Sequence, residues 1–222
     1  MPIFYENRVP RLENTNVDLQ NDIGRIMEKY EMSEDMEEKL ENEFSTAYEI
    51  LTRDDRLEKV AEDIVSHYMG RGNSGKAMVV CIDKKTTVKM YLKVQKHFKA
   101  YRSRLEARLV QSSLDTEKQG IMKEIEALDA LDTAVIISLG NNQNEIDTFR
   151  KIGIDFRPIR KRLLEEDLET KFKNPENGLR IAFVCNMWLT GFDVPSITTL
   201  YLDKPIKNHA LMQTIARTNR VF

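Results

Sequence analysis

Two short stretches near the end of the chain carry residues whose types and spacing suit phosphate chemistry. Gln213, Arg217 and Arg220 follow one another at intervals of four and three residues. Residues at those intervals share one face of a helix, so an amide and two guanidiniums would lie together. Arginine presents fixed donors that match phosphoryl oxygens and can stabilise a phosphoryl group during transfer. Upstream, Asp193 follows Gly191 closely, and its carboxylate could accept a hydrogen bond from a ribose hydroxyl.

These residues also have an ordinary structural interpretation. Arg217 and Arg220 could be solvated side chains on a surface helix, and Asp193 could cap a helix or close a turn. Residue types and spacing alone leave both interpretations open.

The elements around these residues indicate how they would be positioned. Ile181 to Cys185 is a short apolar run, which predicts a buried strand, and Thr198 to Leu202 predicts a second strand. A helix is expected from about Lys207. Asp193 then lies in the loop after the first strand, and in open α/β sheets ligands bind at the carboxyl ends of the strands.

The same two stretches resemble known helicase motifs. LTGFDVP at 189–195 and QTIARTNR at 213–220 resemble motifs V and VI of superfamily 2 helicases, which belong to the second RecA-like half of the motor. Ala216 stands where that pattern usually has glycine, and Thr214 where a further arginine is common.

A longer resemblance covers most of the chain. FYENRVPRL at 4–12, GKAMVVC at 75–81, KFKNPENGLRIAFVC at 171–185 and the segment from there to Phe222 resemble the motor (R) subunit of type I restriction enzymes. Residues 100–132 fit that family least well.

The resemblance implies a role for each candidate residue in ATP hydrolysis. Arg217 and Arg220 would reach the γ-phosphate as finger and sensor. Asp193 would contact the ribose or relay the nucleotide state, Gly191 would allow close backbone approach, and Gln213 would orient motif VI.

The resemblance also implies cofactors and partners. ATP and Mg²⁺ would bind between two RecA-like halves, and Thr190 would touch the phosphate backbone of double-stranded DNA. The expected partners are the upstream RecA-like and nuclease domains of the same subunit, together with the modification and specificity subunits. The chain would be a piece of a longer polypeptide, beginning just past the first motor half, and inactive alone.

Two alternatives remain at this point. The chain could be a non-catalytic RecA-like module that binds DNA or a partner, which would have no need of Arg217 and Arg220. It could also be the second motor half of another DNA helicase or translocase.

Gly70 to Lys76, GRGNSGK, matches the spacing of a phosphate-binding P-loop but not its context. A P-loop follows a strand and opens a helix, so that backbone amides face the phosphate. This stretch follows a predicted helix, Arg53 to Met69, and precedes a predicted strand, Ala77 to Ile82. We therefore expect a loop here, and an ATP site that this chain cannot complete alone.

Charge is unevenly distributed although the formal net charge is −2. Glu13 to Asp63 contains 17 acidic and 6 basic residues, whereas Lys84 to Arg108 contains nine basic residues and one acidic residue. The basic stretch could face DNA, but we favour a solvated or intramolecular role.

The remaining composition predicts a reduced, soluble, cytoplasmic protein. Cys81 and Cys185 lie in apolar runs, which favours buried thiols over a disulfide or a metal site. His67, His97 and His209 form no ligand cluster in sequence, so no protein-bound metal is expected. No signal peptide or membrane-spanning run is present.

The order of elements predicts the fold class. After residue 76, strands alternate with helices, which is typical of a parallel sheet covered on both faces. We expect an α/β, RecA-like domain over residues 71–222, preceded by a helical lead-in over residues 1–70. Further helices are expected at Glu117 to Leu131 and Arg160 to Phe172, a strand at Thr133 to Ser138, and a polar turn at Gly140 to Glu145.

Overall fold

A computed structural model of the chain describes residues 6, 8, 45–72, 75–189, 194 and 196–204. The described strands are β1 (Lys76–Cys81), β2 (Asp132–Ile136), β3 (Leu179–Val184) and β4 (Ile197–Asp203). The described helices are α3 (Ser45–Leu51), α4 (Asp54–Gly70), α5 (Lys84–Gln111), α6 (Asp115–Asp129), α7 (Asn142–Lys151), α8 (Arg157–Glu165) and α9 (Leu168–Lys173).

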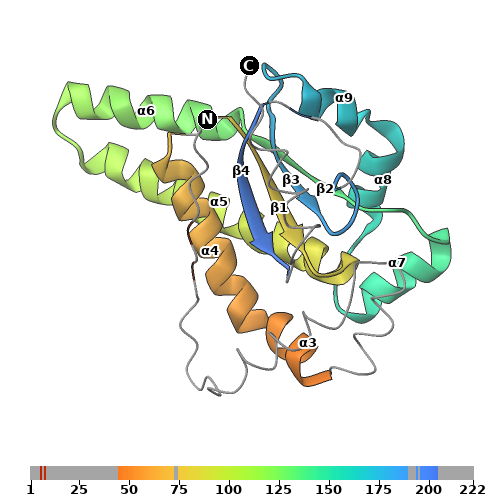
Figure 1. Cartoon of the computed structure of the whole chain (residues 1–222). Helices are drawn as coiled ribbons and strands as arrows, with labels where there is room; N and C mark the ends of the chain where they lie inside the picture. Colours follow the sequence, from red (N-terminus) through yellow and green to blue (C-terminus); the bar gives the residue numbers. More distant parts are fainter. Residues whose placement is uncertain are drawn as a thin grey trace.

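The four strands form one parallel sheet in the order β2-β3-β1-β4, with helices packed around it (Figure 1). Val80 of β1 pairs with Val184 of β3 and with Leu202 of β4, so the carboxyl ends of these strands share one edge. The predicted α/β class is confirmed, with a parallel sheet and flanking helices in a RecA-like arrangement.

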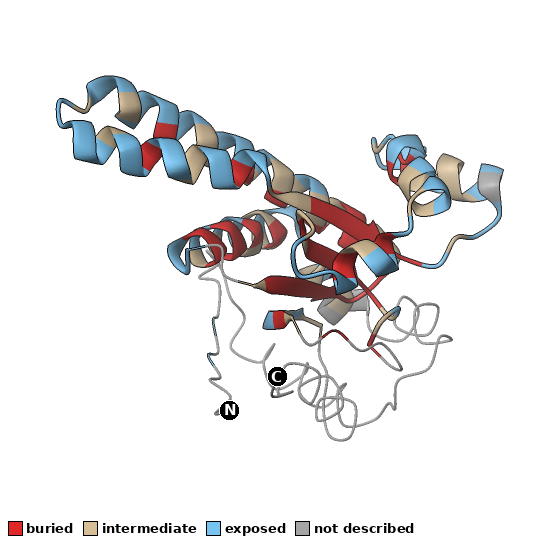
Figure 2. Ribbon diagram, turned by 90° about the horizontal axis from the view of Figure 1, so that it is seen from above, coloured by how far each residue is buried: buried red, intermediate tan, exposed pale blue. Residues whose placement is uncertain are grey.

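Alternate residues of the central strands enter two separate apolar layers. Ala77, Val79 and Cys81 of β1 join the layer built from α4 and α5, while Met78 and Val80 join the layer that includes α9. Successive side chains of a strand point to opposite faces, so a strand covered on both sides is apolar throughout. The central strand β1 is accordingly buried along its whole length and β3 along nearly all of its length, whereas the edge strand β4 is largely only partly buried (Figure 2).

Helix α4 belongs to the same core as the sheet. Its residues Leu57, Ala61 and Ile64 are at most 2% exposed and cluster with Val79. Helix α4 ends at Gly70, as predicted. The division into a lead-in and a motor domain stays a prediction, but part of the expected lead-in supplies one face of the core.

Helices α5 and α6 form an antiparallel hairpin whose far end projects beyond the sheet (Figures 1 and 2). Asp83 caps α5 by accepting a hydrogen bond from the Thr86 amide at 2.6 Å. Residues 100–132, which the family resemblance covers least, contain the projecting part and the first residue of β2.

Two sequence predictions between β2 and β3 are wrong in detail. The predicted turn at Gly140 to Glu145 is largely the start of α7, a polar helix with few apolar residues to indicate it. The single helix expected from Arg160 to Phe172 is two helices, α8 and α9. They separate because Asp167 caps α9, accepting a hydrogen bond from the Thr170 amide at 3.0 Å.

Candidate functional site

The residues predicted to bind nucleotide and DNA lie outside the described part of the chain, but the segments leading to them are described. The predicted residues are Thr190, Gly191, Asp193, Gln213, Arg217 and Arg220. Leu189 and Val194 stand on either side of the first three, and Lys204 is the described residue nearest before the last three.

Buried apolar residues lie on both sides of Thr190, Gly191 and Asp193, the residues predicted for motif V. Leu189 is 2% exposed and Val194 is 1% exposed, and both belong to the apolar layer around Met78, Val80 and Phe172. Each anchor therefore contributes apolar burial that holds its end of the intervening segment against the sheet.

The approaches to the two motifs meet at the carboxyl edge of the sheet. The Lys204 amine, just past the end of β4, donates to the Asn186 side-chain oxygen at 2.6 Å and to the Cys185 carbonyl at 3.4 Å. Cys185 and Asn186 follow β3 directly. The contact joins the chain just before the predicted motif V to the end of β4, which precedes the predicted motif VI, at the edge where open α/β sheets bind ligands.

A buried ion pair fixes the end of β4. The Arg56 guanidinium of α4 pairs with the Asp203 carboxylate through two contacts and also donates to the Leu51 carbonyl at 2.9 Å. The two side chains are 14% and 7% exposed. Burial raises the pKa of Asp203, while the hydrogen bonds and the charge of Arg56 oppose that rise. Sequence reasoning missed this pair, whose members lie 147 residues apart.

A second acidic group lies just beyond the end of the adjacent strand. Asp83, just past β1 and 5% exposed, accepts a hydrogen bond from the Tyr48 hydroxyl of α3 besides capping α5. Strands β1 and β4 are neighbours, so Asp83 and Asp203 lie at the same edge of the sheet. Helix α3 contacts the first of these carboxylates and helix α4 contacts the second. The edge is thus braced by polar contacts from the N-terminal helices.

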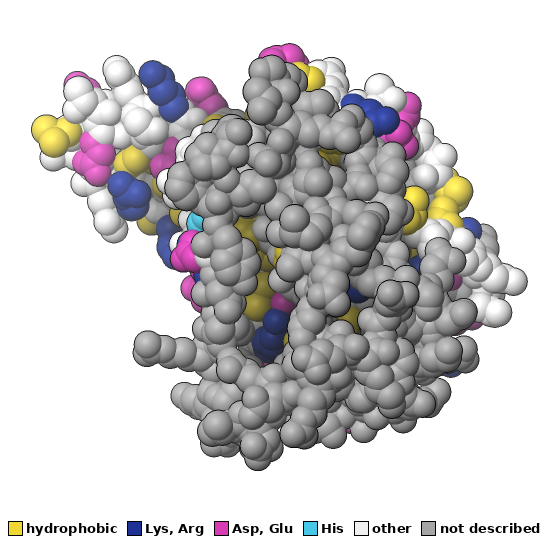
Figure 3. All heavy atoms as spheres, viewed as in Figure 1, with side chains coloured by type: hydrophobic (Ala, Val, Ile, Leu, Met, Phe, Trp, Pro, Cys, Tyr) yellow, Lys and Arg dark blue, Asp and Glu magenta, His cyan; other side chains and the backbone are white. Residues whose placement is uncertain are grey.

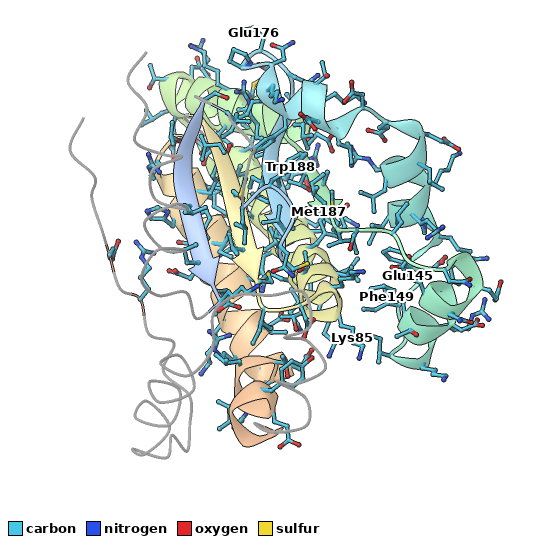
Figure 4. The ribbon with its side chains drawn as sticks, turned by 45° about the vertical axis from the view of Figure 1, so that its right-hand side comes forward. Lys85, Glu145, Phe149, Glu176, Met187 and Trp188 are labelled. Carbon is cyan, nitrogen blue, oxygen red and sulfur yellow. The ribbon has the colours of Figure 1, made fainter. Side chains whose placement is uncertain are left out.

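The loop after β3 contains an aromatic residue that sequence reasoning also missed. Trp188 stacks on Phe172 of α9 with ring centroids 5.4 Å apart and an angle of 27° between the rings. Its neighbour Met187 is 39% exposed. Figure 4 shows both residues in the loop beside the sheet. The sequence signal that could have drawn attention to Trp188 is its position, immediately before the predicted motif V.

Lys76 of the P-loop-like stretch lies at the opposite, amino edge of the sheet. The stretch follows α4 and enters β1, as predicted, and Gly75 adopts a φ of 77° where it meets the strand. The Lys76 side chain is fully buried, and its amine donates to the carbonyls of Leu179 at 2.9 Å and Lys171 at 3.2 Å. In this arrangement the amine makes hydrogen bonds inside the protein core and is not available to bind a phosphate.

Lys76 gives a testable pH dependence. Burial lowers the pKa of its amine from 10.5 to about 8. Between those values the unfolded chain binds more protons than the folded chain, so the free energy of unfolding should rise with pH. Urea denaturation of the wild-type chain across this window should show that rise, and Lys76→Met should flatten it. If the free energy of unfolding rose equally with pH in both proteins, Lys76 would not be the source of the pH dependence.

Part of the basic stretch on α5 forms ion pairs within the protein. Lys93 and Lys96 contact Glu58 of α4 at 2.9 and 2.7 Å, and these contacts lower the pKa of Glu58 to about 2. Arg102 pairs with Asp129 of α6 at 2.7 Å. Both signs of charge are interspersed on the hairpin (Figure 3). The favoured intramolecular role is therefore confirmed for these three basic residues.

The remaining sequence predictions concern thiols and metals. Cys81 and Cys185 are buried thiols that form no disulfide with each other, as predicted, and burial raises the pKa of Cys81. Within the part of the chain that the structure describes, no three His, Cys, Asp or Glu side chains gather in a way that could hold a metal ion. Nor does any helix there have the length and apolar composition needed to cross a bilayer.

The parallel sheet, its flanking helices and the convergence of loops at its carboxyl edge define a RecA-like α/β protein. Residues 73–222 match the model of the family described as "Type I restriction enzyme subunit R domain 3". That match covers more than half of the chain. The chain therefore belongs to the family of type I restriction enzyme R subunits.

Individual relatives agree with this assignment. The MjaIXP type I restriction enzyme endonuclease subunit of Methanocaldococcus jannaschii is 34% identical over 225 residues, covering 100% of this chain and 18% of the relative. The HindI type I restriction enzyme endonuclease subunit of Haemophilus influenzae is 32% identical over 189 residues, covering 82% of this chain and 15% of the relative. The chain thus spans less than a fifth of the length of these relatives.

Proposed function

We propose that this chain is the second RecA-like half of an ATP-dependent motor that moves double-stranded DNA in a type I restriction enzyme. The observation that carries the proposal is the junction made by Lys204 with Cys185 and Asn186. It brings the approaches to the two predicted motifs together at one edge of the sheet.

In this proposal the chain supplies one wall of an ATP site whose other wall is a first RecA-like domain. Arg217 and Arg220 bind the γ-phosphate and stabilise the charge that develops during transfer. Asp193 holds the ribose, Gly191 lets the backbone approach the nucleotide, and Gln213 orients the arginine-bearing helix. Mg²⁺, when bound with ATP, neutralises phosphate charge, and its carboxylate ligands belong to the first domain.

DNA contact in this proposal is made through the phosphate backbone, to which Thr190 contributes. Backbone contacts carry no sequence information, which suits a motor that must move along any DNA. Target recognition and methylation are assigned to the specificity and modification subunits, and DNA cleavage to a nuclease domain of the R subunit.

The position of Lys76 supports the division of labour between two halves. Its amine is engaged by two carbonyls at the amino edge, away from the edge where Lys204 joins the motif approaches. The P-loop-like stretch therefore offers no phosphate-binding lysine in the described fold. The lysine that binds phosphate is expected in the first domain.

DNA-stimulated ATP hydrolysis, measured for this chain alone and for the complete subunit, tests the proposal. We expect turnover by the complete subunit and none by the isolated chain. Turnover by the isolated chain would mean that the stretch from Gly70 to Lys76 binds ATP after all. No turnover by either protein, in the presence of the modification and specificity subunits and target DNA, would contradict the motor assignment.

A further inference from the structure

Trp188 occupies a backbone position that normally excludes a large side chain. The Leu189 amide donates to the Asn186 carbonyl at 3.3 Å, which closes a four-residue turn with Trp188 in third place. The φ of Trp188 is 66°, and no other non-glycine residue in the described part of the chain has a positive φ. Third positions with positive φ usually hold glycine or asparagine, because other side chains crowd the backbone there.

The tryptophan ring offers a physical reason for this choice of residue. It stacks on Phe172, which is fully buried, belongs to α9 and lies with its ring centroid 5.2 Å from the Lys76 amine. Stacked aromatic pairs contribute attraction beyond the burial of their surface, and glycine at this position would provide none. The stack offsets the strained backbone and ties the turn to α9.

The turn stands directly before the predicted motif V. Leu189, next to Trp188, is buried in the same apolar layer as Phe172, and Thr190 follows it. The backbone direction at Trp188 therefore sets where the chain leaves β3 on its way to Thr190 and Asp193. Strained backbone held by its surroundings is common at functional sites.

We propose that Trp188, through its stack on Phe172, is a positioning residue that aims the motif V segment at the ATP site. The inference rests on the proposed function, because it assigns Trp188 to that same site. Trp188 itself touches neither nucleotide nor DNA in this proposal. Its ring acts through the turn it stabilises.

Three substitutions at one position separate the ring from the backbone. In the complete subunit, Trp188→Phe keeps an aromatic ring and should hold the kcat of DNA-stimulated ATP hydrolysis within about twofold of wild type. Trp188→Gly relieves the backbone strain but removes the ring, and Trp188→Ala removes the ring without relieving strain. Both should lower kcat about tenfold with little change in KM, because small displacements of a catalytic segment act on the transition state.

The partner ring provides an independent check. Phe172→Leu should reproduce the loss in kcat, and combining it with Trp188→Gly should add little, because both changes remove the same stack. The matched control is Phe149→Leu, which disrupts another stacked pair, Phe149 and Phe156, with centroids 4.3 Å apart in α7 and α8. It should lower the melting temperature without lowering kcat.

Fluorescence of this chain tests the stack without any activity measurement. Trp188 is its one tryptophan. Phe172→Leu should shift the emission to longer wavelength and Phe149→Leu should not. An unshifted spectrum in folded Phe172→Leu would overturn the stack.

The possible outcomes separate this inference from the proposed function. If the wild-type complete subunit hydrolyses ATP and Trp188→Gly matches it, the positioning role is wrong while the motor assignment stands. If Phe149→Leu lowers kcat as much as Phe172→Leu, the effect is general destabilisation and the inference is again wrong. If the wild-type subunit has no DNA-stimulated turnover, the proposed function fails and the inference fails with it.

Discussion

Replacing Arg217 with alanine in the complete subunit is expected to abolish DNA-stimulated ATP hydrolysis, with kcat falling about 10³-fold or more. An arginine that reaches the transferring phosphate stabilises charge that exists only in the transition state, so its loss acts on kcat. The melting temperature should stay close to that of wild type. Steady-state hydrolysis with saturating DNA, together with thermal unfolding, measures both effects.

Conservative and remote substitutions make this result interpretable. Arg217→Lys keeps the positive charge but loses the planar fork of donors, so it should restore only part of the turnover. Arg104→Ala removes an exposed guanidinium on α5 that lies 5.6 Å from the Tyr101 ring centroid, and it should leave turnover unchanged. Normal ATP turnover in Arg217→Ala would show that this arginine does not stabilise the transferring phosphate. Arg220→Ala, measured alongside, distinguishes the finger from the sensor, since the finger causes the larger loss.

The elements that could be predicted from the sequence are those marked either by a short apolar run or by apolar residues at helical spacing. Ala77–Cys81 in β1 and Ile181–Val184 in β3 are apolar because both faces of the central strands are covered, and such apolar runs can be recognised in a sequence. Helix α4 was predictable from its apolar stripe at helical spacing. Helix α7 could not be predicted in this way, because its sequence is largely polar and shows no apolar stripe. Phe149 is the residue of this helix that is buried in the core.

Strand order and long-range contacts could not be predicted in the same way. The order β2-β3-β1-β4 depends on which surfaces pack best once all helices are present, and no local pattern encodes it. The pair Arg56 and Asp203 likewise becomes neighbours only when α4 packs beside the sheet and β4 joins β1. Each residue alone resembles any other surface charge in the sequence.

The candidate site divides along a similar line. The residues predicted to form the motifs, such as Arg217, stand out in the sequence because the proposed chemistry requires particular residue types at fixed spacing. The residues that hold the flanks of the motifs, including Trp188, Phe172 and Lys204, have no such requirement. Their roles depend on a turn with positive φ, a ring stack and an amine that bridges two strand ends. Those features follow from packing.

The second large effect expected is on stability, from Arg56→Ala. The substitution leaves the Asp203 carboxylate, 7% exposed, without its cation, and removing one partner of a buried pair costs about 3 to 5 kcal/mol of unfolding free energy. Urea denaturation of this chain measures the loss. The control is Arg53→Ala, which breaks an exposed pair with Asp55 nearby and should change the free energy of unfolding far less, because exposed ion pairs are screened by water. Equal losses in the two variants would contradict the buried pair.

The loss in Arg56→Ala should itself depend on pH. Burial already raises the pKa of Asp203 in the presence of Arg56, and removing the cation raises it further. A carboxyl whose pKa is higher in the folded chain than in the unfolded chain loses stability as pH rises between the two values. The variant should therefore be closest to wild type at acidic pH, where Asp203 takes up a proton, and should fall further below it as the pH rises and that proton is lost.

Replacing both partners identifies the source of that pH dependence. In Arg56→Met combined with Asp203→Leu, no uncompensated charge remains, and apolar replacement of a buried pair is often neutral for stability. The double variant should recover most of the loss and show the same pH profile as wild type apart from the contribution of Asp203. A double variant that is no more stable than Arg56→Ala would contradict this explanation, because it would show that the loss does not come from an unpaired buried carboxylate.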